Sequence, residues 1–316
     1  MIPARTPWRR LRRRFLLAWT VVVAALLVAG FLNTLHPALD SVSHFRLHLA
    51  AVLVLSLVLV SWSGSRAARV CALLCGVLAI SANVPVGQIF ARETVSQDKA
   101  HIFRLLQINV RFNNPTPFEL LAVIRNTKAD VVTLEEVNDQ WVEELASLDD
   151  LYPHKILCGV RPIDGVAIFS RRSFDATRPP TCIGNTSFAA ASINFNGKTV
   201  SVAAVHLKWP WPFPQRDQIE ALAPEIGRLG ANALLAGDFN ATPWSAATGR
   251  IAKAGELTLV PSVGPTWSPY SLPSLLRFAG LPIDQLLQKG KVVVRSVRKI
   301  EAPGSDHSAL IVDFTL

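Results

Sequence analysis

The sequence predicts an α/β domain of two packed mixed sheets covered by helices, preceded by a membrane-spanning segment. Three observations predict this class. The first ninety residues carry the excess hydrophobicity of a chain that is 50% hydrophobic and only 17% charged. The remainder intersperses many short apolar runs with few helical patterns. Asn196-Gly197 separates two such runs and favours a hairpin over strict alternation of strand and helix.

Three apolar runs, residues 15–32, 45–62 and 70–90, dominate the first part of the chain. Each is about long enough to cross a bilayer. We therefore expect residues 1–91 to form a basic head and three transmembrane helices. The alternative for the first run is a cleaved signal peptide, which would leave the orientation of the other two unchanged.

Charge orients these expected spans. Nine of the 32 Lys and Arg residues precede residue 92, against one of the 23 acids. Six of these arginines precede the first run, and Arg66 and Arg69 lie between the second and third. The positive-inside rule then predicts a multi-pass protein of the cell (inner) membrane, with the rest of the chain on the outer or periplasmic side. That rest holds 23 bases and 22 acids, so the net charge of +9 does not indicate a nucleic-acid-binding surface.

A polar linker is expected at residues 92–100, followed by one globular catalytic domain at 101–316. Hydrophobic periodicity predicts its elements. Strands are expected at 103–110, 130–134, 166–170, 189–195, 199–205, 233–236, 283–287, 292–297 and 309–314, and helices at 118–126, 140–148 and 215–229.

Polar side chains stand at the ends of five of these strands: Asn109, Glu136, His206, Asp238 with Asn240, and Asp306 with His307. Asp284 adds a carboxylate inside an apolar strand, where it needs a partner. In the stretch GDFNATPWS, Gly237 is expected to permit a sharp turn. Singly, each residue is explained as a turn residue, a first-turn acid or a structural histidine; their coincidence favours a site.

Metal-assisted phosphoester hydrolysis fits this set of residue types. Glu136 and Asn109 offer the oxygen ligands that Mg²⁺ prefers, with Mn²⁺ as the alternative. Asp284 and His307 are candidates for a carboxylate-held general base, because the carboxylate fixes the tautomer of the imidazole and stabilises its cation. The four cysteines form no zinc pattern.

Seven stretches of the domain resemble the endonuclease/exonuclease/phosphatase superfamily. They are LLQINVRFNN, DVVTLEEV, GVAIFSRR, VAAVHLKWP, GDFNATPWS, PIDQLL and SDHSALIVDF, in the family's order. The resemblance implies a four-layer α/β sandwich and a metal-dependent phosphoric ester hydrolase.

The resemblance also implies roles for the strand-end residues. Glu136 and Asn109 hold Mg²⁺, with Asp306 assisting. Asp238 and Asn240 handle the nucleophilic water and the phosphate, His206 contacts the scissile phosphate, and His307 works with Asp284.

Three positions depart from the family pattern. Glu135 stands where the family usually has Gln, and its extra negative charge either tunes metal affinity or lies outside the site. Pro282 replaces a common Arg, and Ala309 replaces a common Pro. None of these changes removes a catalytic group, so activity is expected.

Two loops are candidates for substrate recognition. Residues 208–214 (KWPWPFP) directly follow His206, and residues 267–280 precede Asp284. Trp209 and Trp211 are expected to bind substrate, by stacking on bases or by lying at a lipid interface. The alternative is that the aromatic side chains of the two loops pack against each other.

The leading functional prediction is an outward-facing, membrane-anchored, Mg²⁺-dependent phosphodiesterase or phosphatase that acts on lipid or small phosphoesters. The alternatives are an extracytoplasmic DNA or RNA nuclease and a catalytically silent binding module. No protein partner is evident. Cys158 and Cys182 are expected to pair, because an outward domain meets an oxidising compartment.

Overall fold

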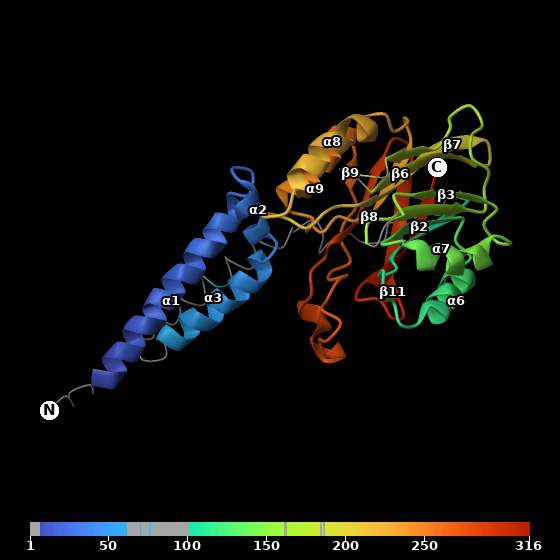
Figure 1. The fold of residues 1–316 in the computed structure, drawn as a ribbon. Helices are drawn as coiled ribbons and strands as arrows, with labels where there is room; N and C mark the ends of the chain where they lie inside the picture. Colours follow the sequence, from blue (N-terminus) through green and yellow to red (C-terminus); the bar gives the residue numbers. More distant parts are fainter. Residues whose placement is uncertain are drawn as a thin grey trace. The chain divides into compact units, whose positions relative to one another are not determined.

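The computed structural model describes residues 7–61, 70, 76, 101–160, 163–183, 185 and 187–316 (Figure 1). The chain divides into two compact units, residues 1–91 and 92–316. Each unit is described by itself.

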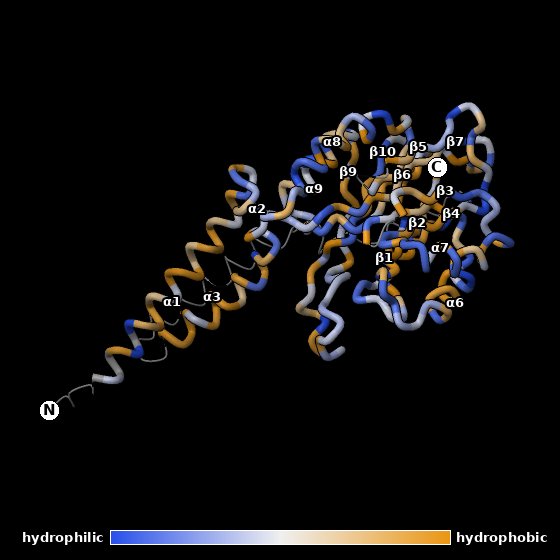
Figure 2. Tube along the Cα trace, in the orientation of Figure 1, coloured by the Kyte–Doolittle hydropathy of each residue, from blue (hydrophilic) through white to orange (hydrophobic). Residues whose placement is uncertain are grey.

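The amino-terminal unit contains α1 (Pro7–Phe31), α2 (Pro37–Ser43) and α3 (Arg46–Ser61). α1 contacts both of the other helices. α2 begins where the side chain of His36 accepts a hydrogen bond from the Ala38 amide. Hydrophobic residues run along most of α1 and α3 (Figure 2).

Among the described residues, the window Arg14–Phe31 of α1 is long and apolar enough to cross a membrane. α3 has 16 residues and rises about 24 Å, which is short of the ~30 Å hydrocarbon core. It reaches spanning length only when α2, bent by 63° from it, counts as part of the same span. Among the described residues, the three expected spans thus reduce to one such helix, or two with the bent pair. The expected run at 45–62 does form a single helix, but α3 has only 16 residues, and the run at 70–90 lies outside the described residues.

The carboxy-terminal unit contains two mixed sheets. Sheet A comprises β1 (Phe103–Asn109), β2 (Val131–Glu135), β3 (His154–Cys158), β4 (Val166–Ser170), β11 (Val293–Glu301) and β12 (Ser308–Thr315). Sheet B comprises β5 (Thr181–Ile183), β6 (Phe188–Phe195), β7 (Lys198–His206), β8 (Ala233–Asp238), β9 (Thr258–Leu259) and β10 (Asp284–Lys289). The strand orders are β11-β12-β1-β2-β4-β3 and β5-β6-β7-β8-β10-β9.

Helices cover the outer faces of both sheets, so the unit has four layers (Figure 1). α6 (Pro117–Thr127) and α7 (Asp139–Leu145, followed by the 3₁₀ turn Ala146–Leu148) bury Leu120, Ile124 and Trp141 against sheet A. α8 (Gln215–Gly227) and α9 (Ala246–Gly255) bury Leu222 and Ile251 against sheet B. The α/β sandwich of two mixed sheets flanked by helices is confirmed.

The strand directions bring the polar ends together. β1 and β2 are parallel, as are β7 and β8, so within each pair both strands end at the same edge of their sheet. β10 runs antiparallel to β8 and starts with Asp284 opposite Asp238. β12 runs antiparallel to β1, so its start, just after His307, lies beside the end of β1. Residues far apart in the chain therefore meet at one end of the sandwich.

Successive side chains of a strand point to opposite faces, and those on the inner faces fill the space between the two sheets. On β1, Leu105 belongs to the inter-sheet core, and Gln107 and Asn109 follow it on the same face. Every residue on that face of β1 is buried, and Asn109 is the one at the site end. The interior thus changes from hydrophobic to polar along the strand direction.

The hairpin at Asn196-Gly197 is confirmed, and both residues adopt positive φ angles of 55° and 86°. α9 and the short strands β3, β5 and β9 are not among the elements expected from the sequence. The sequence signal for α9 was Ser245, because serine is a preferred residue at the start of a helix. In the structure its side chain caps α9 by accepting a hydrogen bond from the Thr248 amide.

Gly237 has a different role from the expected turn. It lies inside β8, which continues to Asp238. Its φ is +152°, and a Cβ at this position would lie 2.0 Å from the carbonyl oxygen of Val205 on β7. A side chain here would push β7 and β8 apart directly beside His206 and Asp238.

Cys158 and Cys182 form a disulfide, as expected. The bond joins β3 of sheet A to β5 of sheet B. It therefore links the two sheets covalently at an edge of the sandwich.

Candidate active site

Asp238 lies at the centre of the polar cluster and is 1% exposed. Its Oδ1 accepts a hydrogen bond from the Asn240 amide at 2.7 Å, and its Oδ2 accepts from Nδ2 of Asn109 at 3.0 Å. The Nε2 atoms of His206 and His307 lie 3.7 and 3.5 Å from Oδ2. Burial raises the pKa of Asp238 to about 6; Asp284 adds to the rise, and both histidines oppose it.

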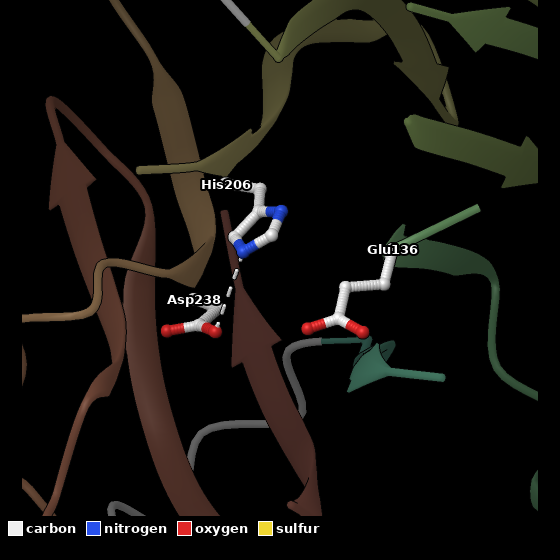
Figure 3. A group of neighbouring side chains, drawn as sticks. All are labelled: Glu136, His206 and Asp238. Atoms are coloured by element: carbon white, nitrogen blue, oxygen red, sulfur yellow. Dashed lines mark ion pairs between the residues drawn. The ribbon is translucent and has the colours of Figure 1, made fainter. Parts of the chain in front are cut away.

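Glu136 faces Asp238 and His206 across the cluster (Figure 3). It follows the end of β2 with a φ of +61°, a conformation unfavourable for a residue with a side chain. Its Oε1 accepts from Asn109 Nδ2 at 3.0 Å, and its Oε2 accepts from the Phe112 amide at 2.9 Å. These contacts fix the carboxylate at the mouth of the cluster.

The cluster fits a hard divalent cation. One oxygen each of Glu136 and Asp238 and a ring nitrogen of His206 lie within 4.8 Å of one another. Carboxylate oxygens are the ligands that Mg²⁺ prefers. The side-chain oxygen of Asn109 accepts from the Arg111 amide at 2.9 Å, so its Nδ2 faces both carboxylates. In this geometry Asn109 links Glu136 to Asp238, and its role as a metal ligand stays a prediction.

His307 and Asp284 form a pair. His307 Nδ1 lies 2.9 Å from Asp284 Oδ2, and both side chains are buried. Burial alone would lower the pKa of His307, but the carboxylates of Asp284 and Asp238 outweigh it and raise the pKa to about 10. The two carboxylates therefore favour the protonated, cationic form of the imidazole.

Asn240 and His206 form the side of the cluster next to β7. Asn240 has a φ of +46°, and its Nδ2 donates to the Leu207 carbonyl at 2.8 Å and lies 3.4 Å from His206 Nε2. These two residues and Asp238 therefore converge on one space.

Among the described residues, two groups of acidic and histidine side chains lie close enough together to hold a metal: Glu136-His206-Asp238 and Asp238-Asp284-His307. Asp306 belongs to neither group. Its Oδ2 accepts from the indole nitrogen of Trp267 at 3.0 Å. The indole of Trp267 also contacts that of Trp209 edge-on, with ring centroids 6.3 Å apart. The structure thus connects Asp306 to the two aromatic loops rather than to Glu136, and its assistance at a metal stays a prediction.

Two residues beside the site were not expected from the sequence, Trp267 as an anchor and Gln107 as a buried donor. Gln107 is 1% exposed, and its Nε2 donates to Glu135 Oε2 and Asp284 Oδ1. The signal was its position two residues before Asn109 on the same strand face.

A four-layer sandwich with carboxylates, amides and an Asp-His pair at the ends of its strands defines a class of metal-dependent phosphoester hydrolases. The sequence profile of the endonuclease/exonuclease/phosphatase family matches residues 106–307, and the chain belongs to that family. The enzymes of the family use Mg²⁺. No curated protein matches the chain by sequence.

Several solved structures share the fold. Humanized TDP2 of D. rerio is 17% identical, with a TM-score of 0.55 over 68% of this chain and 99% of that one. An endonuclease/exonuclease/phosphatase of Bacteroides vulgatus is 18% identical, with a TM-score of 0.54 over 68% and 99%. One from Beutenbergia cavernae DSM 12333 is 20% identical, with a TM-score of 0.52 over 68% and 72%. At these identities the likeness concerns the fold.

Glu135 provides a pH-dependent prediction. Burial raises its pKa well above 4.5, and Asp284 and Asp238 raise it further, while Gln107 lowers it. Between the unfolded and folded pKa values the native state binds more protons, so stability falls as pH rises through this window. Glu135→Gln removes the ionisation, so its thermal stability relative to wild type should increase from pH 4.5 to pH 8.

The measurement is thermal denaturation of both proteins in chelator at the two pH values. A stability difference that is independent of pH would contradict the assignment of a raised pKa to Glu135.

Proposed function

We propose that this protein is a membrane-anchored, Mg²⁺-dependent phosphodiesterase or phosphatase that faces outward and acts on lipid or small phosphoesters. The observation that carries the proposal is the convergence of Glu136, Asp238 and the Asp284-His307 pair beside two exposed aromatic loops.

The metal would be held by the carboxylates of Glu136 and Asp238. A bound Mg²⁺ supplies polarisation of the phosphoryl oxygen and stabilisation of the charge on the leaving oxygen. His307 must be neutral to act as a base, and a divalent charge held beside Asp238 would favour that form.

The side chains of the protein bind the phosphate, orient the water and accept its proton. His206 and Asn240, which lie on one side of Asp238, bind the non-bridging oxygens of the phosphate. Asp238 orients the water, and neutral His307 accepts its proton at Nε2, because Nδ1 is held by Asp284. Burial of these groups strengthens their electrostatic effect.

The aromatic loops support a substrate presented at a lipid interface. Trp209, Trp211 and Phe213 are each more than half exposed. On the second loop, Leu275 and Phe278 are 82% and 75% exposed, in the 3₁₀ segment Ser274–Ala279. The bases of the loops pack through Trp209 and Trp267, while their tips leave apolar side chains in solvent.

Charge supports the same choice of substrate. Residues 92–316 carry 23 bases and 22 acids, which is few excess charges for a surface that must neutralise several DNA phosphates. A single phosphoester head group needs only the local site.

The test compares substrates on the full chain in detergent or nanodiscs. We expect Mg²⁺-dependent turnover of a phosphodiester in a bilayer or micelle to exceed turnover of plasmid DNA. Trp209→Ala and Trp211→Ala should lower the former about tenfold and leave hydrolysis of a soluble chromogenic phosphodiester nearly unchanged, because they remove interface binding. Phe118→Ala, which removes an exposed aromatic side chain from α6, is the control.

The nuclease is the second candidate. Exposed indole rings beside a phosphate site can stack on bases, and the guanidinium of Arg111 lies 4.3 Å from the ring centroid of Tyr270 on the second loop. Plasmid nicking at physiological salt without turnover of any lipid would make this candidate the leading one.

The membrane location has its own test. α1 and the charge asymmetry support a cytoplasmic amino terminus and an outward catalytic unit. Alkaline phosphatase fused after Leu316 should be active in a bacterial host, and green fluorescent protein fused at the same residue should stay dark. The reverse pattern would contradict the orientation.

A further inference from the structure

A buried hydrogen-bond chain crosses from sheet A to sheet B directly behind the site. Gln107 on β1 donates one Nε2 proton to Glu135 Oε2 at 2.8 Å and the other to Asp284 Oδ1 on β10 at 2.9 Å. Gln107 and Glu135 are 1% and 0% exposed, and Asp284 is 3% exposed. The same Asp284 carboxylate holds His307 through its other oxygen.

We propose that Gln107 and Glu135 are positioning residues for hydrolysis: Gln107 fixes the Asp284 carboxylate, and Glu135 fixes the direction of the Gln107 amide. Neither side chain reaches the substrate space, so both act through Asp284 and His307. The inference rests on the proposed function of the Asp284-His307 pair.

The geometry around Asp284 shows what Gln107 contributes. The Asp284 backbone amide donates to Thr266 Oγ1 at 3.1 Å, which fixes the main chain. Oδ2 accepts from His307 Nδ1, and Oδ1 accepts from Gln107. Without the Gln107 contact the carboxylate is free to rotate about χ2, and the imidazole loses its fixed orientation.

Glu135 decides which end of the Gln107 amide faces Asp284. A glutamine amide can present either its oxygen or its nitrogen. The oxygen of Gln107 has no hydrogen-bond partner among the described residues, whereas its nitrogen has two carboxylate partners. Two acceptors on one side of the amide favour the donor orientation. Glu135, which precedes Glu136 in the sequence, thus lies behind the candidate metal site, in contact with Gln107.

Substitutions of similar size test the chain of contacts. Gln107→Leu is of similar size and removes the donor, so we expect kcat to fall about 10- to 100-fold with KM unchanged. Glu135→Leu should cause a loss of the same kind, because the Gln107 amide is then free to flip. Glu135→Gln keeps an accepting oxygen at the same place and should retain activity within about threefold.

Thr133→Val is the matched control. Thr133 pairs with Gln107 across β1 and β2, is fully buried, and has no hydrogen-bond partner among the described residues. The substitution is isosteric, removes a polar group from the same layer, and should leave kcat unchanged. Gln107→Glu, of equal size and polarity, replaces Gln107→Leu if the latter does not fold, and should also lower kcat.

A second readout needs no turnover. In the full-length, metal-free protein, the Nδ1 proton of His307 should give a low-field NMR resonance that is absent in His307→Ala. We expect Gln107→Leu and Glu135→Leu to shift or broaden it, and Thr133→Val and Glu135→Gln to preserve it. If wild type hydrolyses no phosphoester, the proposed function fails, and this resonance still decides the positioning inference.

The inference is overturned if Gln107→Leu keeps kcat within twofold and the His307 resonance in place. It is also overturned if Thr133→Val lowers kcat as much as Gln107→Leu, because any polar-to-apolar change in that layer would then suffice. Equal losses in Glu135→Gln and Glu135→Leu would remove Glu135 from the mechanism.

Discussion

Glu136→Gln should abolish most Mg²⁺-dependent hydrolysis and leave the fold intact. Glu136 faces the space between Asp238 and His206, and its two oxygens accept from Asn109 and Phe112. Glutamine has the same size and keeps one accepting oxygen, but it lacks the charge that attracts a divalent cation. We expect activity to fall roughly 10²- to 10³-fold, the effect of losing one group that stabilises transition-state charge.

Two measurements check this expectation. Calorimetric titration with Mn²⁺ or Mg²⁺ should show weakened binding, and circular dichroism should show an unchanged fold. Glu143→Gln, at an exposed position of α7, is the control for removing a carboxylate. Full activity of Glu136→Gln at low metal concentration would exclude Glu136 as a ligand.

His307→Ala should lower kcat by about 10²- to 10⁴-fold, because it deletes the proposed general base. Asp284→Asn should cost less, since the imidazole remains but loses its fixed tautomer and the stabilisation of its cation. Steady-state kinetics on a soluble chromogenic phosphodiester measure both variants without any contribution from lipid binding. His101→Ala, outside the cluster, is the control.

The order of these two effects tests the pair. His307 Nδ1 is 2.9 Å from Asp284 Oδ2, so the two residues should act as a unit and their losses should not add in the double variant. A harmless Asp284→Asn beside a severe His307→Ala would show that the pair does not operate in the reaction.

The sequence alone determined most strands of the carboxy-terminal unit and most of the polar residues that meet at their ends. Period-two burial and turn residues gave most strands of the carboxy-terminal unit, including the hairpin at Asn196-Gly197. The polar residues after apolar runs identified the groups that the structure brings together around Asp238. These features are readable because a strand's alternation and its end are local properties of the sequence.

Membrane spans were less well determined. The apolar run at residues 45–62 forms one helix as expected, but α3 has 16 residues and is too short to span a membrane on its own. Hydropathy counts apolar residues but does not fix where a helix begins and ends, and a 16-residue helix rises less than the thickness of the hydrocarbon core.

Only the tertiary structure decided which polar groups meet across the sandwich. The alternation on β1 places Gln107 and Asn109 on one face, but it does not say that Gln107 stands between Glu135 and Asp284. It likewise does not say that Asn109 directs its nitrogen at Glu136 and Asp238, or that Asp306 accepts from Trp267. Those partners come from another strand, sheet or loop, and the packing of the hydrophobic core between the sheets sets their distance and register.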